Sequence, residues 1–166
     1  MPKFVLDTNI FIESHLRNYP IDIFPSYWKL LKELADDDVI ISIDKVQDEL
    51  NHYEDEISVW VEENIPDSFF KTTNTNEVTS EYGKVVSWAQ SRNDHFKEAA
   101  INEFSEFDKA DAWLVAYCML KENTLVTLEV SDPRSKKKIH IPDVCIAHDV
   151  KHCNLVEMFR ALGIKL

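Results

Sequence analysis

Glycine is nearly missing from this sequence: two of its 166 residues are glycine, and six are proline. A composition this poor in both residues argues against a linker-rich or low-complexity protein. It also excludes two classes of nucleotide-binding protein, because the Walker loop and the dinucleotide-binding fingerprint both need several glycines at fixed spacing.

Long apolar runs and a cysteine framework are missing as well. No stretch of about 18 apolar residues could span a membrane, and no basic segment followed by an apolar one suggests export. The three cysteines are an odd number without framework spacing, which is typical of a reducing compartment. The absence of a G-x-S-x-G motif leaves a nucleophilic hydrolase poorly supported. We therefore expect a cytoplasmic protein without a membrane segment.

Positive charge is scarce, because 18 Lys and Arg residues face 30 Asp and Glu residues and the formal net charge is −12. This balance argues against broad electrostatic attraction to nucleic acid. The acidic residues either form a solvated surface that keeps the protein soluble, or some of them gather to hold cations. One dense basic stretch, with Arg134 and Lys136 to Lys138, is either a solvated turn or a contact for phosphate groups.

The hydrophobic pattern predicts one α/β domain, since 166 residues with 45% hydrophobic content are ample for a core. The expected strands lie within residues 1–10 and at Val39–Ile41, Thr124–Leu128 and Ile139–Ile141. The expected helices cover Tyr27–Ala35, a segment from Asp44, residues 55–64 and 76–104, a segment from Asp108, and Asn154–Leu162 before Gly163. Strands that alternate with helices indicate an α/β sandwich with a mostly parallel sheet.

Two carboxylates follow predicted strands directly. Asp7 interrupts the apolar run Phe4–Glu13, and Glu129 comes just after the strand that ends at Leu128. Sites in open parallel sheets form beyond the carboxyl ends of the strands, so both side chains are expected at one edge. Taken alone, Asp7 is equally explained as a helix cap or turn former, and Glu129 as a loop residue.

Three further acids lie on predicted helices. Glu49 borders the apolar face formed with Val46 and Leu50, where a purely solvated glutamate is less common. Asp108 and Asp111 fall in the first helical turn, where Asp108 is expected to cap the helix and Asp111 either complements its dipole or serves a site.

Gathering such acids would raise their pKa values, and a divalent cation would relieve the repulsion. Mg²⁺ is typically held by few carboxylates and substrate phosphates, and it promotes phosphodiester hydrolysis.

Five short motifs in this order carry a resemblance to a known family. Asp7-Thr8-Asn9 after the first strand, the V-x-x-E-L helix of Val46 to Leu50 and the D-x-x-D-A start of Asp108 to Ala112 resemble PIN-domain nucleases. Thr127-Leu128-Glu129 stands where that family usually has T-x-D, and Ile141-Pro142-Asp143-Val144-Cys145 resembles the tail of a less-studied branch.

The resemblance implies a PIN-like three-layer α/β/α sandwich with a mostly parallel central sheet. It covers residues 1–166 as a single domain, with an extra helical insertion at about 66–104. The implied activity is that of a Mg²⁺- or Mn²⁺-dependent endoribonuclease, the toxin of a VapC-like toxin–antitoxin pair. The implied partners are RNA, an antitoxin protein and a second copy in a homodimer.

The same resemblance assigns site residues. Asp7, Glu49 and Asp111 are the implied metal ligands, and Glu129 or Asp143 supplies the fourth acid. The implied catalytic residues are Asp7, Glu49, Asp111 and Glu129. Asn9 or Thr8 is expected to hold Asp7 by hydrogen bonds, with Asp108 and Thr127 as further supporting residues. Arg134, Lys136, Lys137 and Lys138 become candidate contacts for the RNA backbone.

Two alternatives remain open. The chain could be a catalytically inert PIN-like module that binds RNA or protein, with its acids preserving the fold. A receiver-like phosphoacceptor would need an acidic pair near the end of the first strand and a lysine after a late strand. Glu13 lies too far past the strand for that pair, and no lysine has the required place.

Overall fold

A five-stranded parallel sheet forms the centre of the computed structural model, which describes residues 3–166. The strands are β1 (Phe4–Leu6), β2 (Ile40–Ile43), β3 (Phe70–Lys71), β4 (Thr124–Val126) and β5 (His152–Cys153). Their order is β3-β2-β1-β4-β5, and all neighbouring pairs are parallel. Residues 1 and 2, which the sequence placed at the start of the first strand, lie outside the described residues.

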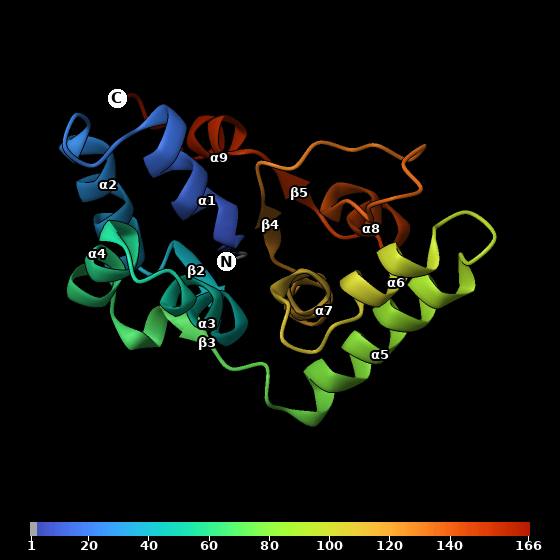
Figure 1. Ribbon diagram of the computed structural model, residues 1–166. Helices are drawn as coiled ribbons and strands as arrows, with labels where there is room; N and C mark the ends of the chain where they lie inside the picture. The colour runs from blue at the N-terminus through green and yellow to red at the C-terminus, as the bar shows by residue number, and fades with distance from the viewer. Residues whose placement is uncertain (1–2) are drawn as a thin grey trace.

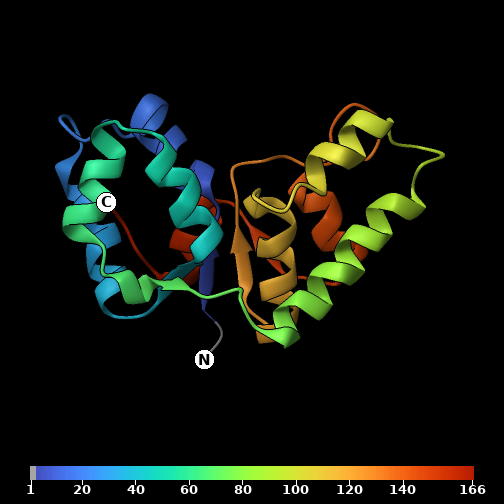
Figure 2. The ribbon, with the colours of Figure 1, turned by 60° about the horizontal axis from the view of Figure 1, so that its bottom comes forward.

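Helices cover both faces of this sheet (Figure 1). The group α1 to α4 lies on one side and the group α5 to α8 on the other, as the second view also shows (Figure 2). The first group comprises α1 (Thr8–Glu13), a π-helical turn at Ser14–Asn18, α2 (Pro25–Asp36), α3 (Asp44–His52) and α4 (Glu56–Asn64). The remaining helices are a 3₁₀ turn at Asp67–Phe69, α5 (Asn76–Ser91), α6 (Glu98–Phe104), α7 (Ala110–Lys121), α8 (Ile141–Ala147) and α9 (Leu155–Leu162).

This architecture confirms the expected α/β/α sandwich with a parallel central sheet. Apolar side chains of the central strands are buried, including Val5, Ile41 and Leu125. Parallel strands covered on both faces need such continuous apolar runs, which explains their β-branched composition. Within residues 3–166, no helix has both the length and the apolar character needed to cross a membrane.

The helix ends follow local sequence signals. In α9, the Asn154 side chain accepts a hydrogen bond from the Glu157 N–H, while Glu157 accepts from the Asn154 N–H, each at 2.8 Å. Gly163 then ends the helix with a φ of 69°, a left-handed conformation that glycine adopts without a Cβ clash. The sequence therefore located this last helix correctly at both ends.

Two short elements differ from the sequence expectation. Ile139–Ile141 was expected as a strand, but α8 begins at Ile141, with Pro142 in its first turn. Proline suits that position because its fixed φ is helical and its missing N–H has no partner to lose there. The fifth strand is instead His152–Cys153. Residues 66–104 supply α5 and α6, and they also contribute β3, which pairs with β2.

The strand register determines where the site lies. In the pair β1 and β4, Leu6 lies opposite Val126, so Asp7 and Thr127 leave the sheet side by side. The Asp7 N–H extends the ladder by donating to the Val126 carbonyl at 2.9 Å. Both residues are thereby fixed at the carboxyl edge of the two adjacent strands, as expected from a parallel sheet.

Candidate active site

Asp7 is a buried carboxylate at the junction of β1 and α1. It is 4% exposed and is the N-cap residue of α1. Its Oδ1 accepts a hydrogen bond from the Thr8 N–H at 2.7 Å, and its Oδ2 accepts one from the Thr127 hydroxyl at 2.8 Å. Burial and the charges of Asp111 and Glu129 nevertheless raise the pKa of Asp7 well above its usual value. The polar residues that follow β1 thus place at the sheet edge a carboxyl group whose ionised form is disfavoured.

Thr127 organises this edge. Besides donating to Asp7, its Oγ1 accepts the Glu129 N–H at 3.1 Å and lies 3.3 Å from Asn9 Nδ2. The Asn9 side chain also accepts the Leu128 N–H at 3.2 Å. Of the two residues expected to hold Asp7, Thr8 does so through its N–H, whereas the Asn9 side chain instead fixes the backbone after β4.

Glu49 joins three elements. From α3, its Oε2 accepts the Thr8 hydroxyl at 2.6 Å, and its Oε1 accepts the Ala110 N–H at 2.8 Å. Ala110 is the first residue of α7, so Glu49 satisfies one of the donors that a helix start leaves without an intrahelical partner. Asp108 was expected to cap this helix, but it is exposed and Lys109 occupies the N-cap position.

Asp111 lies in the first turn of α7, as expected. Within residues 3–166, no hydrogen bond or ion pair to its carboxylate is found. Burial, followed by the charges of Glu129 and Glu49, raises the pKa of Asp111 to about 7. Its charge is thus offset mainly by more distant lysines, of which Lys138 has the larger effect.

Glu129 completes the group, which we name the acidic cluster: Asp7, Glu49, Asp111 and Glu129. One Glu129 oxygen lies 3.0 Å from Lys138 Nζ, and the other accepts the Ile141 N–H at 2.7 Å. Asp143, the other candidate for the fourth acid, accepts hydrogen bonds from the Ser131 hydroxyl and the Asp132 N–H. Asp143 therefore fixes the loop after β4, and the structure brings Glu129 rather than Asp143 beside Asp7 and Asp111.

The donor chemistry of the acidic cluster fits a hard divalent cation. Mg²⁺ and Mn²⁺ take oxygen ligands, and all four side chains are carboxylates. In the described part of the chain, however, no three Asp, Glu, His or Cys side chains converge closely enough to share one ion. The two glutamates are instead engaged by protein donors, so the cluster is an arrangement of neighbouring acids and not a preformed chelate.

The contact partners of the two glutamates were missed by sequence reasoning. The Thr8 hydroxyl and the Ala110 N–H hold Glu49, and the Ile141 N–H holds Glu129. Backbone donors carry no side-chain signature, so the sequence offers no signal for two of the three. The Thr8 hydroxyl was visible within the Asp7-Thr8-Asn9 motif, but its partner lies 41 residues away.

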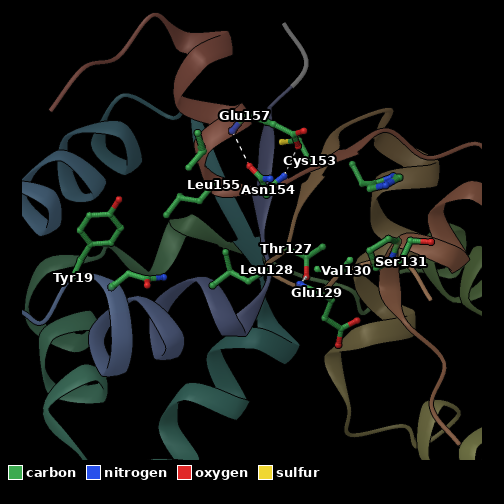
Figure 3. Close-up of a pocket in the computed structure, with 14 residues that line it drawn as sticks. Tyr19, Thr127, Leu128, Glu129, Val130, Ser131, Cys153, Asn154, Leu155 and Glu157 are labelled. Carbon is green, nitrogen blue, oxygen red and sulfur yellow. Dashed lines mark hydrogen bonds between the residues drawn. The ribbon is translucent and has the colours of Figure 1, made fainter. Parts of the chain in front are cut away.

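A cavity of about 520 Å³ adjoins the acidic cluster at the ends of β4 and β5. Figure 3 shows Leu128 and Glu129 between Tyr19 on one side and Ser131 on the other. Its lining contains two acids, Glu129 and Glu157, and neither lysine nor arginine. The cavity therefore suits an uncharged group better than a phosphate.

The metal-free acidic cluster should make stability depend on pH. The Asp111 carboxyl has a pKa of about 7 in the folded state and about 3.9 in the unfolded state. The folded state binds more protons between these values, so stability falls as pH rises from about 4 to about 7. Asp111→Asn should therefore raise the melting temperature in chelator, more strongly at about pH 8 than at about pH 5.

Thermal unfolding followed by circular dichroism would measure this effect, on a scale of about 2–4 °C per kcal/mol for a chain of this size. Asp108→Asn is the matched control, because it makes the same substitution at an exposed position three residues earlier. A gain in melting temperature that does not depend on pH would contradict the raised pKa of Asp111. Equal changes in melting temperature for Asp111→Asn and Asp108→Asn would contradict it as well.

Comparison with known proteins places the chain in a family. Residues 4–166 match the family model described as a domain of unknown function (DUF4411). The chain belongs to this family. Among curated proteins, none matches this DUF4411 chain.

A solved structure shares the fold of the DUF4411 chain. It is the crystal structure of VapBC2 from Rickettsia felis bound to a DNA fragment from their promoter, with a TM-score of 0.51 and 14% sequence identity. The match covers 91% of this chain and 97% of the chain in that structure. At this identity the likeness concerns the fold alone, and it agrees with the PIN-like sandwich expected from the sequence.

Proposed function

We propose that this protein is a Mg²⁺- or Mn²⁺-dependent endoribonuclease. The observation that carries the proposal is the acidic cluster, in which the carboxylates of Asp7 after β1, Glu49 on α3, Asp111 on α7 and Glu129 after β4 lie near one another at the carboxyl edge of the sheet. Such a concentration of negative charge is unfavourable without a cation, since the neighbouring acids help to raise the pKa values of Asp7 and Asp111. A site in which neighbouring charges perturb pKa values in this way is a candidate for a functional site.

In the proposed reaction, Asp7, Glu49 and Asp111 bind the cation and Glu129 completes the acid set. The bound ion supplies Lewis-acid activation of the phosphodiester and of water. The Thr127 hydroxyl and the Thr8 N–H orient Asp7, while the Thr8 hydroxyl and the Ala110 N–H orient Glu49. Lys138 lies beside Glu129, where its ammonium group can contact a phosphate oxygen.

We further propose that the protein is the toxin of a toxin–antitoxin pair. The likeness to a chain of the VapBC2 structure supports this extension through the fold. An antitoxin that covers the acidic cluster would keep the nuclease inactive, and a homodimer is the proposed assembly. The antitoxin and the second copy in the homodimer both belong to the proposal. Measuring the mass of the purified complex would test for each of them.

Cleavage of a mixed pool of single-stranded and structured RNAs tests the activity. The purified full chain should produce fragments with Mn²⁺ or Mg²⁺ and none with chelator, because the acids alone cannot activate water. Mass spectrometry of the preparation shows whether a bound protein blocks the site. Equal background with metal and with chelator, from a preparation free of a second protein, would count against the nuclease.

The inert-module alternative is favoured by one observation. Glu129 is occupied by Lys138 and Ile141, and no three acids in residues 3–166 share an ion-binding geometry. An inert module should bind Mn²⁺ weakly, whereas a nuclease should bind it measurably by calorimetry. Tight Mn²⁺ binding that Asp111→Asn removes and Asp108→Asn preserves would exclude the inert module.

A further inference from the structure

Two segments far apart in sequence lie side by side. The Lys97 N–H, at the start of α6, donates to the Lys136 carbonyl at 2.9 Å, and His95 Nε2 lies 3.1 Å from the Ser135 carbonyl oxygen. The loop between β4 and α8 passes beside α6 in the second ribbon view (Figure 2). Six cations thereby share one region, which we name the basic surface: Arg92, Lys97, Arg134, Lys136, Lys137 and Lys138.

The cations of the basic surface are largely unneutralised. Within residues 3–166, ten of the 18 Lys and Arg residues form no ion pair, and half of those ten belong to the basic surface. Asp94, Glu98 and Asp132 lie in or next to the same segments, yet none of them pairs with these cations. Half of the unpaired positive charge in the described residues therefore lies in one region of this acidic protein.

Part of the basic surface is held in a fixed position. The Arg92 guanidinium lies over the rings of Trp88 and Phe96, with centroid distances of 5.7 and 5.4 Å. Arginine stacked on aromatic rings keeps its charge and its outer donors while losing little further freedom on binding. The backbone hydrogen bond from Lys97 to Lys136 and the contact of the His95 ring with the Ser135 carbonyl likewise hold the loop against the start of α6.

The basic surface leads directly into the acidic cluster. Lys138 ends the basic stretch, and its Nζ lies 3.0 Å from Glu129. At physiological salt the Debye length is about 8 Å, so nearby charges decide a contact and the net charge of −12 acts weakly at greater distances. The local charge of the basic surface is therefore positive, although the net charge of the protein is negative.

We propose that the basic surface binds the phosphate backbone of the RNA strand and leads it to the acidic cluster at Lys138. The inference rests on the proposed function for the identity of the strand. Contacts from lysine and arginine to phosphates fix position without reading sequence, so the surface acts on RNA of any sequence. It also gives Arg92 and Lys97, within the segment 66–104, a role in substrate binding.

Salt-dependent binding of RNA tests this proposal. The probe is a fluorescein-labelled single-stranded RNA of about 12 nucleotides, within the usual range of single-strand site sizes. The variant carries Lys97→Gln, Arg134→Gln, Lys136→Gln and Lys137→Gln, all at exposed positions. The control carries Lys121→Gln, Lys151→Gln, Arg160→Gln and Lys165→Gln, which removes four exposed, unpaired cations outside the basic surface. The two proteins therefore have the same net charge.

Fluorescence anisotropy in chelator measures binding without cleavage. Each lost phosphate contact should reduce the slope of log affinity against log salt by about 0.7. We expect the variant to lose at least about tenfold in affinity at low salt and the control to bind like wild type. Equal losses in variant and control, or no loss in either, would overturn the proposal. Binding of polyglutamate but not of RNA would also overturn it and would point to an acidic protein partner.

The binding and cleavage results separate the two proposals. A wild type that binds RNA through the basic surface but never cleaves it would end the nuclease proposal and keep this one. If the wild type cleaves RNA but the four-site variant binds RNA as well as the wild type does, the nuclease proposal stands and the proposal for the basic surface fails.

Discussion

Asp7→Asn is expected to lower the rate of metal-dependent RNA cleavage by more than about 100-fold, beyond the loss typical when a group that merely supports a metal ligand is removed. Asparagine keeps the shape of the side chain, and its carbonyl oxygen can still accept the Thr8 N–H. What it loses is the negative charge that the proposed cation requires. The fold should survive, because burial disfavours the ionised form of Asp7. Initial rates with Mn²⁺, together with thermal unfolding, would measure both effects.

The matched control is Asp48→Asn. It removes one negative charge from an exposed position on α3, next to Glu49, without touching the acidic cluster. Cleavage by this variant should match wild type. An Asp7→Asn protein that is folded and cleaves RNA at the wild-type rate would remove Asp7 from the chemistry.

Trp28→Ala is expected to lower the free energy of unfolding by about 3–5 kcal/mol. Trp28 is 1% exposed, and its ring packs edge-on against Tyr27 and Trp60, with centroid distances of 5.2 and 4.9 Å. Its indole N–H donates to the Tyr19 carbonyl at 2.7 Å, so alanine leaves both a cavity and an unpaired acceptor. Because whole domains have about 5–15 kcal/mol of stability, this loss would be a large share of the total.

Urea denaturation would measure this loss. Ile146→Ala on α8 serves as the control, because Ile146 is 64% exposed and surface changes usually stay within about 0.5 kcal/mol. A Trp28→Ala protein that unfolds at the wild-type midpoint would show that the aromatic packing around α2 contributes little. Tyr19 also lines the cavity beside Glu129, so the same variant links core packing to the shape of the site.

The sequence was most informative where a clear apolar run predicted a strand and the rules of parallel sheets then placed the residue that follows it. The apolar runs of β1, β2 and β4 were visible, and parallel pairing places Asp7 and Glu129 at one edge. It was least informative for elements of two residues. His152–Cys153 is too short to show periodicity, and its pairing with β4 depends on a neighbour about 27 residues away.

Details of the acidic cluster escaped prediction for a related reason. The hydrogen bond from Thr127 to Asp7 joins residues 120 positions apart, and that from Ala110 to Glu49 joins residues 61 apart. Motif spacing singled out the acids that form the acidic cluster, but not which donors hydrogen-bond to them or in which direction. Only part of the basic surface could be predicted from the sequence. The stretch from Arg134 to Lys138 is a recognisable basic run, whereas its contact with Lys97 depends on a backbone hydrogen bond.

The sheet ends on both sides in a strand of two residues, β3 at Phe70–Lys71 and β5 at His152–Cys153. Edges this short present few free backbone donors and acceptors, which protects the protein against edge-to-edge aggregation. They also disfavour partners that recognise a protein by β-augmentation, the addition of an extended peptide as one more strand. A regulator of this protein is therefore expected to bind through helices or side chains, and its own fold need not supply a complementary strand.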